Sequence, residues 1–239
     1  MKRTFIRGVW GIYDNSHRLL ARRSKIDKDI DRVLSCKFNE SFVTYVFGED
    51  NFQRMQNKGF NCVLIHKEPS MFDLIKYQYR HKMEVIRYAM EEDKYDEIVW
   101  LDWDCIPQKK LPEDFWEKCG QKGPIQGCLQ MYYRKKCNWR IVNKRKVING
   151  GFLYIRDKTM PFRAIKLWET MPQDNDEPAW SLLIDKIDEE FLNNNWENTD
   201  LSMKRFWDIY ETSYCVLGHG SPFPKELLDI KDACFIHFI

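Results

Sequence analysis

The first hundred residues alternate between strand-like and helix-like patterns of apolar and polar positions. Segments rich in β-branched and aromatic residues predict strands at Thr4 to Tyr13, Ser41 to Phe47, Asn61 to Ile65 and Ile98 to Leu101. Between them we expect a short helix at 51–58, ended by Gly59, and a longer helix at 70–92 with a repeating apolar face. Strands that alternate with helices predict a largely parallel α/β sheet.

The pattern becomes less regular after Pro107. Further strands are expected at 126–133, 147–155, 213–217 and 234–238, and further helices at 160–170 and 177–193. Neither an internal repeat nor a low-complexity segment or linker is visible in the sequence. We therefore expect one domain that covers residues 1–239.

The clearest chemical signal is a pair of carboxylates at the end of the strand 98–101. Asp102 and Asp104 follow that apolar run directly and are separated by Trp103. Carboxylates at the end of a buried strand repel each other and lose solvation, and a divalent cation relieves both costs. Open α/β sheets bind ligands at the carboxyl ends of their strands, and a hard cation there keeps positions for phosphate oxygens. The pattern favours a metal–diphosphate site over a solvated acidic turn.

Composition narrows the class of protein. A net charge of +2 gives no field that would favour nucleic acid, and the eight cysteines form no C-x-x-C pair, which favours a reducing compartment. Aromatic residues make up 15% of the chain, which suits a packed core and ring-stacking surfaces. We see no signal peptide and no apolar run of roughly 20 residues, so we expect a soluble cytoplasmic protein without a transmembrane segment.

Four segments, in this order along the chain, resemble the A-type-fold glycosyltransferases that use nucleotide sugars and a D-x-D motif. They are His81-Lys82-Met83, the strand Tyr95 to Asp104, the strand Ile148 to Arg156 with Asn149-Gly150-Gly151, and Phe235 to Phe238. The resemblance implies a single-domain α/β fold with a mostly parallel central sheet flanked by helices. The nucleotide-binding half would cover about 1–107, and the donor-sugar and acceptor half about 108–239.

The resemblance also implies an activity. The chain would be a hexosyl- or pentosyltransferase that uses Mn²⁺ or Mg²⁺ to move a sugar from a nucleoside diphosphate sugar, with UDP as the default base. The acceptor would be a hydroxyl of a glycan or glycoconjugate. A nucleotidyltransferase that makes activated sugars is an alternative, but Gly8-Val9-Trp10-Gly11 lacks the basic phosphate loop of that class. A carbohydrate-binding protein without activity would explain the aromatic residues but not the acid pair.

By resemblance, the metal ligands are Asp102, Asp104 and His237. A neutral imidazole ligand suits Mn²⁺ better than Mg²⁺. His237 could instead be a structural histidine bonded to backbone, and His219, between two glycines, competes for the role. Asp102 could also contact the ribose or the sugar.

The donor contacts that the resemblance implies are spread along the chain. They comprise Arg7, Trp10, Tyr13, Lys82, Asp102, Trp103, Asn149, Gly150 and Gly151. Each has a simpler alternative: strand aromatics are commonly core residues, an exposed helix lysine commonly has no role, and strand glycines can mark a bulge. Trp103 is bulkier than the small residue often found between the two acids of the motif, which leaves its contact with the donor open.

By resemblance, the catalytic carboxylates are Asp176 and Glu177, at the start of the predicted helix 177–193. In an inverting enzyme one of them would deprotonate the acceptor hydroxyl, and in a retaining enzyme it would orient the donor. Acids in the first turn of a helix can also serve only to complement the helix dipole. The stretch 134–146 has seven basic residues and no acid, so it is either an acceptor-recognition loop or a solvated hairpin loop.

Overall fold

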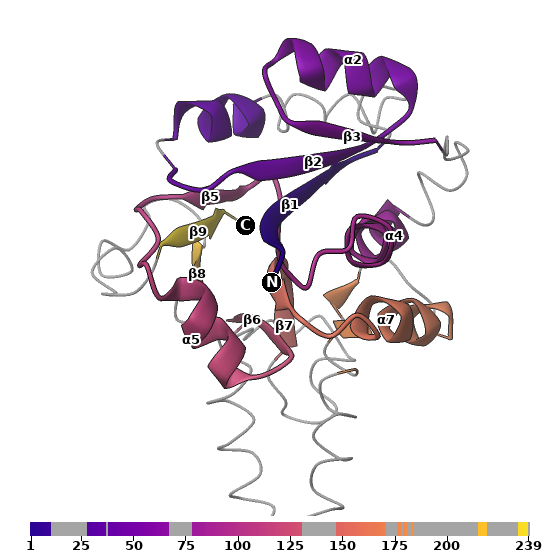
Figure 1. Ribbon diagram of the computed structural model, residues 1–239, viewed down its shortest axis with the longest axis vertical. Helices are drawn as coiled ribbons and strands as arrows, with labels where there is room; N and C mark the ends of the chain where they lie inside the picture. Colours follow the sequence, from indigo (N-terminus) through magenta and orange to yellow (C-terminus); the bar gives the residue numbers. More distant parts are fainter. Residues whose placement is uncertain are drawn as a thin grey trace, which may run out of the picture.

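A mixed six-stranded sheet forms the centre of the molecule (Figure 1). The computed structural model describes residues 1–10, 28–36, 38–66, 78–130, 147–170, 176–177, 179–180, 183, 215–218 and 234–238. The sheet contains β1 (Arg3–Val9), β2 (Phe42–Phe47), β3 (Cys62–Ile65), β4 (Glu97–Leu101), β6 (Ile125–Gln130) and β7 (Val147–Ile155), in the order β3-β2-β1-β4-β7-β6. The first four strands in that order are parallel, and β7 runs antiparallel to both β4 and β6. The predicted fold class, a mostly parallel sheet flanked by helices, is confirmed.

A smaller, three-stranded sheet lies beside the first. It contains β5 (Cys105–Pro107), β9 (Phe235–Phe238) and β8 (Cys215–Gly218) in the order β5-β9-β8. β5 pairs antiparallel with β9, and Cys105 lies opposite His237 in that register. This pairing brings the end of the sequence next to the residue that follows Asp104.

Helices cover both faces of the large sheet. They are α2 (Glu49–Asn57), α4 (Gln78–Glu91), α5 (Phe115–Lys122) and α7 (Met160–Glu169), and residues 28–35 are also helical. Figure 1 shows α4 and α7 together on one side of the large sheet, with α5 and the small sheet on the other. None of the helices within these ranges is long and apolar enough to cross a bilayer.

Side chains of β1 and β4 point alternately to the two faces of the sheet and so belong to two separate hydrophobic clusters. Ile6 and Trp100 pack with residues of α4 and α7, whereas Phe5, Val99 and Leu101 pack with residues of α5 and β9. Because both faces are covered, β1 is buried from Thr4 onward and β4 is buried throughout. The site described below lies where these strands end.

Several element boundaries differ from the sequence prediction. β1 ends at Val9, so Trp10 lies outside the strand, and residues 11–13 lie outside the described residues. β5 and α5 were not predicted, because β5 is only three residues long and α5 spans only two turns. Most of the predicted helix 177–193, the basic stretch 134–146, Tyr13 and His219 also lie outside the described residues.

Candidate functional site

A four-residue turn, Asp102 to Cys105, joins the two sheets. The Cys105 N–H donates to the Asp102 carbonyl over 2.9 Å, which closes the turn. On its first side, the Asp102 N–H donates to the Gly151 carbonyl over 2.9 Å and so continues the pairing of β4 with β7. On its other side, Cys105 begins β5 opposite His237. Asp102 thus belongs to the large sheet, and Asp104 leads into the small one.

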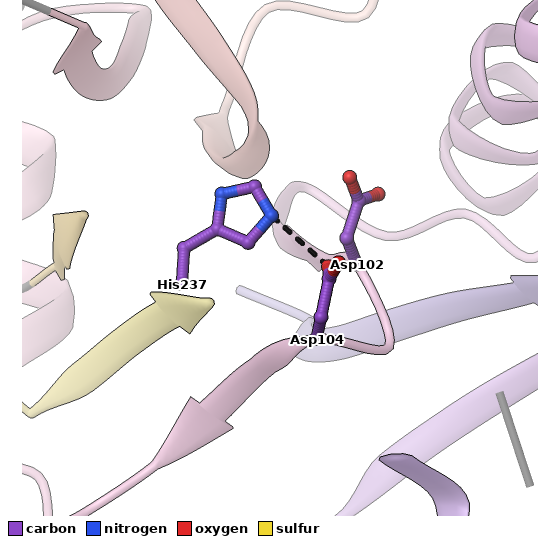
Figure 2. A group of neighbouring side chains, drawn as sticks. All are labelled: Asp102, Asp104 and His237. Atoms are coloured by element: carbon purple, nitrogen blue, oxygen red, sulfur yellow. Dashed lines mark hydrogen bonds and ion pairs between the residues drawn. The ribbon is translucent and has the colours of Figure 1, made fainter. Parts of the chain in front are cut away.

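Asp102, Asp104 and His237 form a compact group of metal-ligating side chains. One ligand atom from each lies within 4.8 Å of the others, and His237 Nε2 is 3.0 Å from Asp104 Oδ1 (Figure 2). The carboxylates are 29% and 20% exposed, so the group is open to a ligand on one side. The buried Nδ1 of His237 has no hydrogen-bond partner among the described residues. Two carboxylates and one imidazole are a donor set that fits a divalent cation such as Mn²⁺.

Lys82 of α4 places a buried ammonium group next to these acids. Its Nζ is 3.1 Å from Asp102 Oδ1, 3.1 Å from Asp176 Oδ2 and 3.1 Å from the Gly150 carbonyl oxygen. Burial alone would lower the pKa of Lys82, but the two carboxylates raise it above its ordinary value, so the lysine is charged. Burial and the neighbouring Asp102 raise the pKa of Asp176, while Lys82 opposes that rise. The ammonium group of Lys82 therefore connects Asp102 of the D-x-D pair to Asp176 of the predicted catalytic segment.

Two indole N–H groups hold the carboxylates that flank Lys82. Trp100 Nε1 donates to Asp102 Oδ1 over 2.7 Å, and Trp180 Nε1 donates to Asp176 Oδ2 over 2.9 Å. Neither tryptophan was predicted from the sequence to belong to the site. The only signal for them is spacing, because residues i and i+2 share a strand face and residues i and i+4 share a helix face.

β7 passes so close to the site that its two glycines leave no room for side chains. A Cβ at Gly150 would lie 2.7 Å from Asp176 Oδ2, and a Cβ at Gly151 would collide with the ring of His237. Pairing with β6 skips from Leu153 to Asn149, so the glycine segment is a bulge opposite that strand. The backbone of Asn149 belongs to β7, and its side chain lies outside the described part of the chain. Contacts of this segment with a donor remain a prediction.

Three other residues predicted to contact the donor are placed differently from one another. Arg7 is fully buried, Trp103 is 8% exposed, and Trp10 is partly exposed and stacks on Trp100 with ring centroids 6.2 Å apart. Glu177 is also partly exposed. Nothing in this geometry tests whether these residues contact a substrate, and their roles stay predictions.

No protein-family model matches the chain, and no curated protein does. Among solved structures, the bifunctional glycosyltransferase WbbM matches 99% of this chain, over 45% of its own length, with a TM-score of 0.50 and 9% identity. The chain has the A-type glycosyltransferase fold. Mouse xyloside xylosyltransferase 1 (TM-score 0.48, 11% identity, 99% of this chain and 97% of its own) is also similar. So is a glycosyltransferase involved in glycosylation of the major capsid of PBCV-1 (TM-score 0.46, 12% identity, 99% and 93%). At 9% identity the match to WbbM shows the fold alone.

Proposed function

We propose that this protein is a metal-dependent glycosyltransferase that moves a sugar from a nucleoside diphosphate sugar to an acceptor hydroxyl of a glycan or glycoconjugate. The observation that carries the proposal is the convergence of Asp102, Asp104 and His237 at the carboxyl end of β4. That edge of an open α/β sheet is where such folds bind ligands. The proposed donor is a UDP-sugar, and the transferred sugar could be a hexose or a pentose.

The proposed cofactor is Mn²⁺ or Mg²⁺, held by Asp102, Asp104 and His237. When bound, the cation would act as a Lewis acid on the diphosphate leaving group. The imidazole of His237 favours Mn²⁺ of the two. The partial exposure of both carboxylates leaves one side of the group open for phosphate oxygens.

Lys82 is proposed to position the donor side of the site. Its ammonium group is fixed by Asp102, Asp176 and the Gly150 carbonyl, so its charge and both carboxylates are held in one place before substrate arrives. Such fixed groups do not need to reorganise when charge develops in the reaction. The close approach of β7 at Gly150 and Gly151 supports a sugar pocket bounded by backbone rather than by side chains.

Asp176 and Glu177 are the proposed catalytic carboxylates. Asp176 is fully buried and is held by Lys82 and Trp180, which suits the orientation of a donor sugar in a retaining reaction. Glu177 is more exposed and suits the acceptance of a proton from an acceptor hydroxyl in an inverting reaction. The two assignments predict different consequences when each charge is removed separately.

The function is tested by thermal shift with UDP, GDP and CTP, each with and without Mn²⁺, followed by a nucleotide-sugar hydrolysis screen. We expect UDP to raise the melting temperature only with Mn²⁺, and at least one UDP-sugar to be hydrolysed slowly. Stabilisation by CTP alone, with pyrophosphate release, would instead indicate a nucleotidyltransferase. If no nucleotide stabilises the protein under any condition, the glycosyltransferase proposal is wrong.

A further inference from the structure

Trp103, the bulky residue between the two acids, is anchored in the protein core. Its indole packs with Val9, Val46 and Ile106 in one hydrophobic cluster and lies edge-on to Phe60, with ring centroids 5.5 Å apart. Only 8% of the residue is exposed. A side chain that would be expected to crowd the donor is therefore turned into the interior, where it can fix the turn that carries it.

The polar end of Trp103 is attached to the central strand of the large sheet. Its Nε1 donates to the Gly8 carbonyl of β1 over 2.8 Å. Gly8 pairs with Tyr45 of β2, and β1 pairs with β4 from Arg3 to Ile6, so the acceptor carbonyl belongs to a strand of the large sheet. This hydrogen bond joins the middle of the turn to a neighbouring strand instead of to solvent.

Arg7, the preceding residue of β1, holds the other end of the turn. Its Nη2 donates to the Cys105 carbonyl over 3.2 Å, and its guanidinium lies over the rings of Trp103 and Phe42, 5.1 Å and 4.7 Å from their centroids. Its Nε and Nη1 have no hydrogen-bond partner within the described ranges. Burying a charge in this way is costly. Of the three contacts named here, those with the Cys105 carbonyl and the Trp103 ring are with the turn, and the third is with Phe42.

We propose that Arg7 and Trp103 are positioning residues, which hold Asp102 and Asp104 in metal-binding geometry by fixing the turn 102–105 to β1. The turn is the junction of two sheets, and His237 comes from the small one. A shift of the turn relative to β1 would move the two carboxylates relative to each other and to His237. Groups behind a metal site that orient its ligands commonly change metal affinity 10- to 100-fold when they are removed.

The proposal is tested with Trp103→Phe, which removes the N–H donor but keeps an aromatic ring, and with Arg7→Lys, which keeps the charge but loses the planar contact. Trp116→Phe is the matched control, because Trp116 is equally buried but packs in the cluster around α5. Two quantities are measured: Mn²⁺ affinity of the folded protein, and hydrogen exchange of the turn amides without metal. Melting temperature is recorded for all three variants.

We expect Mn²⁺ affinity to fall roughly 10- to 100-fold in Trp103→Phe and Arg7→Lys. Exchange at the Cys105 amide should rise roughly fivefold, the equivalent of one lost hydrogen bond. Trp116→Phe should lower only the melting temperature. If Trp103→Phe does not fold, the Mn²⁺ affinity and hydrogen exchange of Arg7→Lys alone decide whether the positioning role holds.

The measurement of Mn²⁺ affinity depends on the proposed function, because it assumes a metal site. The measurement of hydrogen exchange at the turn amides does not depend on it. Unchanged affinity and unchanged exchange in the folded variants would overturn the positioning role. If the natural protein binds no Mn²⁺ while the variants exchange faster, the metal proposal fails and the positioning of the turn stands.

Discussion

The two carboxylates of the D-x-D turn are separated by one residue, yet they have different surroundings. Asp102 ends the large sheet and is bound by Lys82 and Trp100, at 3.1 Å and 2.7 Å. Asp104 precedes the small sheet and has His237 at 3.0 Å. In Figure 2 the Asp104 carboxylate points to the imidazole, and the Asp102 carboxylate points away from it.

The difference shows that identical side chains two positions apart can have separate partners when a turn leads from one sheet into another. In the proposed metal site, the Asp104–His237 side would supply the nitrogen ligand. The Asp102 side is connected, through Lys82, to Asp176. Changes on the Asp104 side should therefore act mainly on metal affinity, and changes on the Lys82 side on transfer and stability.

The largest effect is expected from Asp104→Asn. The amide keeps the shape of the side chain but loses the charge that a hard cation requires, so Mn²⁺-dependent UDP binding should be abolished while the fold remains. Calorimetric titration of UDP with Mn²⁺ measures this, and Asp50→Asn on the exposed first turn of α2 is the control. Unchanged affinity in Asp104→Asn would remove this residue from the metal site.

Removing the charge of Asp176 or Glu177 should affect chemistry instead of metal binding. If Glu177 is the general base, Glu177→Gln should lower transfer roughly 10²- to 10⁴-fold and leave Mn²⁺–UDP binding normal. If Asp176 orients the donor in a retaining reaction, Asp176→Asn should have the larger effect on kcat. Both are read from steady-state transfer kinetics beside a binding titration. Full transfer rates in both variants would show that neither carboxylate is catalytic.

Lys82→Met should be the most destabilising change on the Asp102 side. It leaves two carboxylates facing each other without the cation between them, and breaking a buried ion pair on one side costs about 3–5 kcal/mol. The free energy of unfolding in urea measures it. Lys118→Met removes an exposed partner of Asp114 and should change stability little. A stable Lys82→Met protein would mean that the buried pairing contributes little.

Substitutions of the two glycines of β7 should give the smallest effects, but each acts on a different side of the site. Gly151→Ala pushes against the His237 ring and should weaken Mn²⁺ binding roughly 10- to 100-fold. Gly150→Ala pushes against Asp176 and Lys82 and should lower stability with less effect on metal affinity. Both are measured by Mn²⁺ titration and thermal unfolding. Equal effects of the two variants on both quantities would contradict the division of the site.

The sequence predicted the parts of the fold that are encoded locally. β2, β3 and β4 are mostly apolar, β7 ends in the apolar run Phe152 to Ile155, and each strand lies close to where the pattern placed it. β5 could not be found in this way, because its three residues are stabilised by pairing with β9, about 130 residues away in the sequence. α5 was not found either, because its eight residues cover only about two turns and are too few to show a clear helical repeat of apolar positions.

For the site, the sequence indicated which residue types to expect but not how they pair. Asp102, Asp104 and His237 were predicted as a set by resemblance, and the structure brings their side chains together. Lys82 was expected to be an exposed lysine or a donor contact, and only the packing of α4 against β1 and β4 shows that it is buried between two acids. The inward orientation of Trp103 depends on β1 in the same way.

The central claim is that a divalent cation is held by ligands from both sheets, and pulsed electron paramagnetic resonance of protein-bound Mn²⁺ tests it most directly. At one equivalent of Mn²⁺, the account predicts a nitrogen coupling from one directly bound imidazole, which disappears in His237→Ala while weaker Mn²⁺ binding persists through Asp102 and Asp104. A spectrum with oxygen ligands alone in the natural protein, unchanged by His237→Ala, would contradict it.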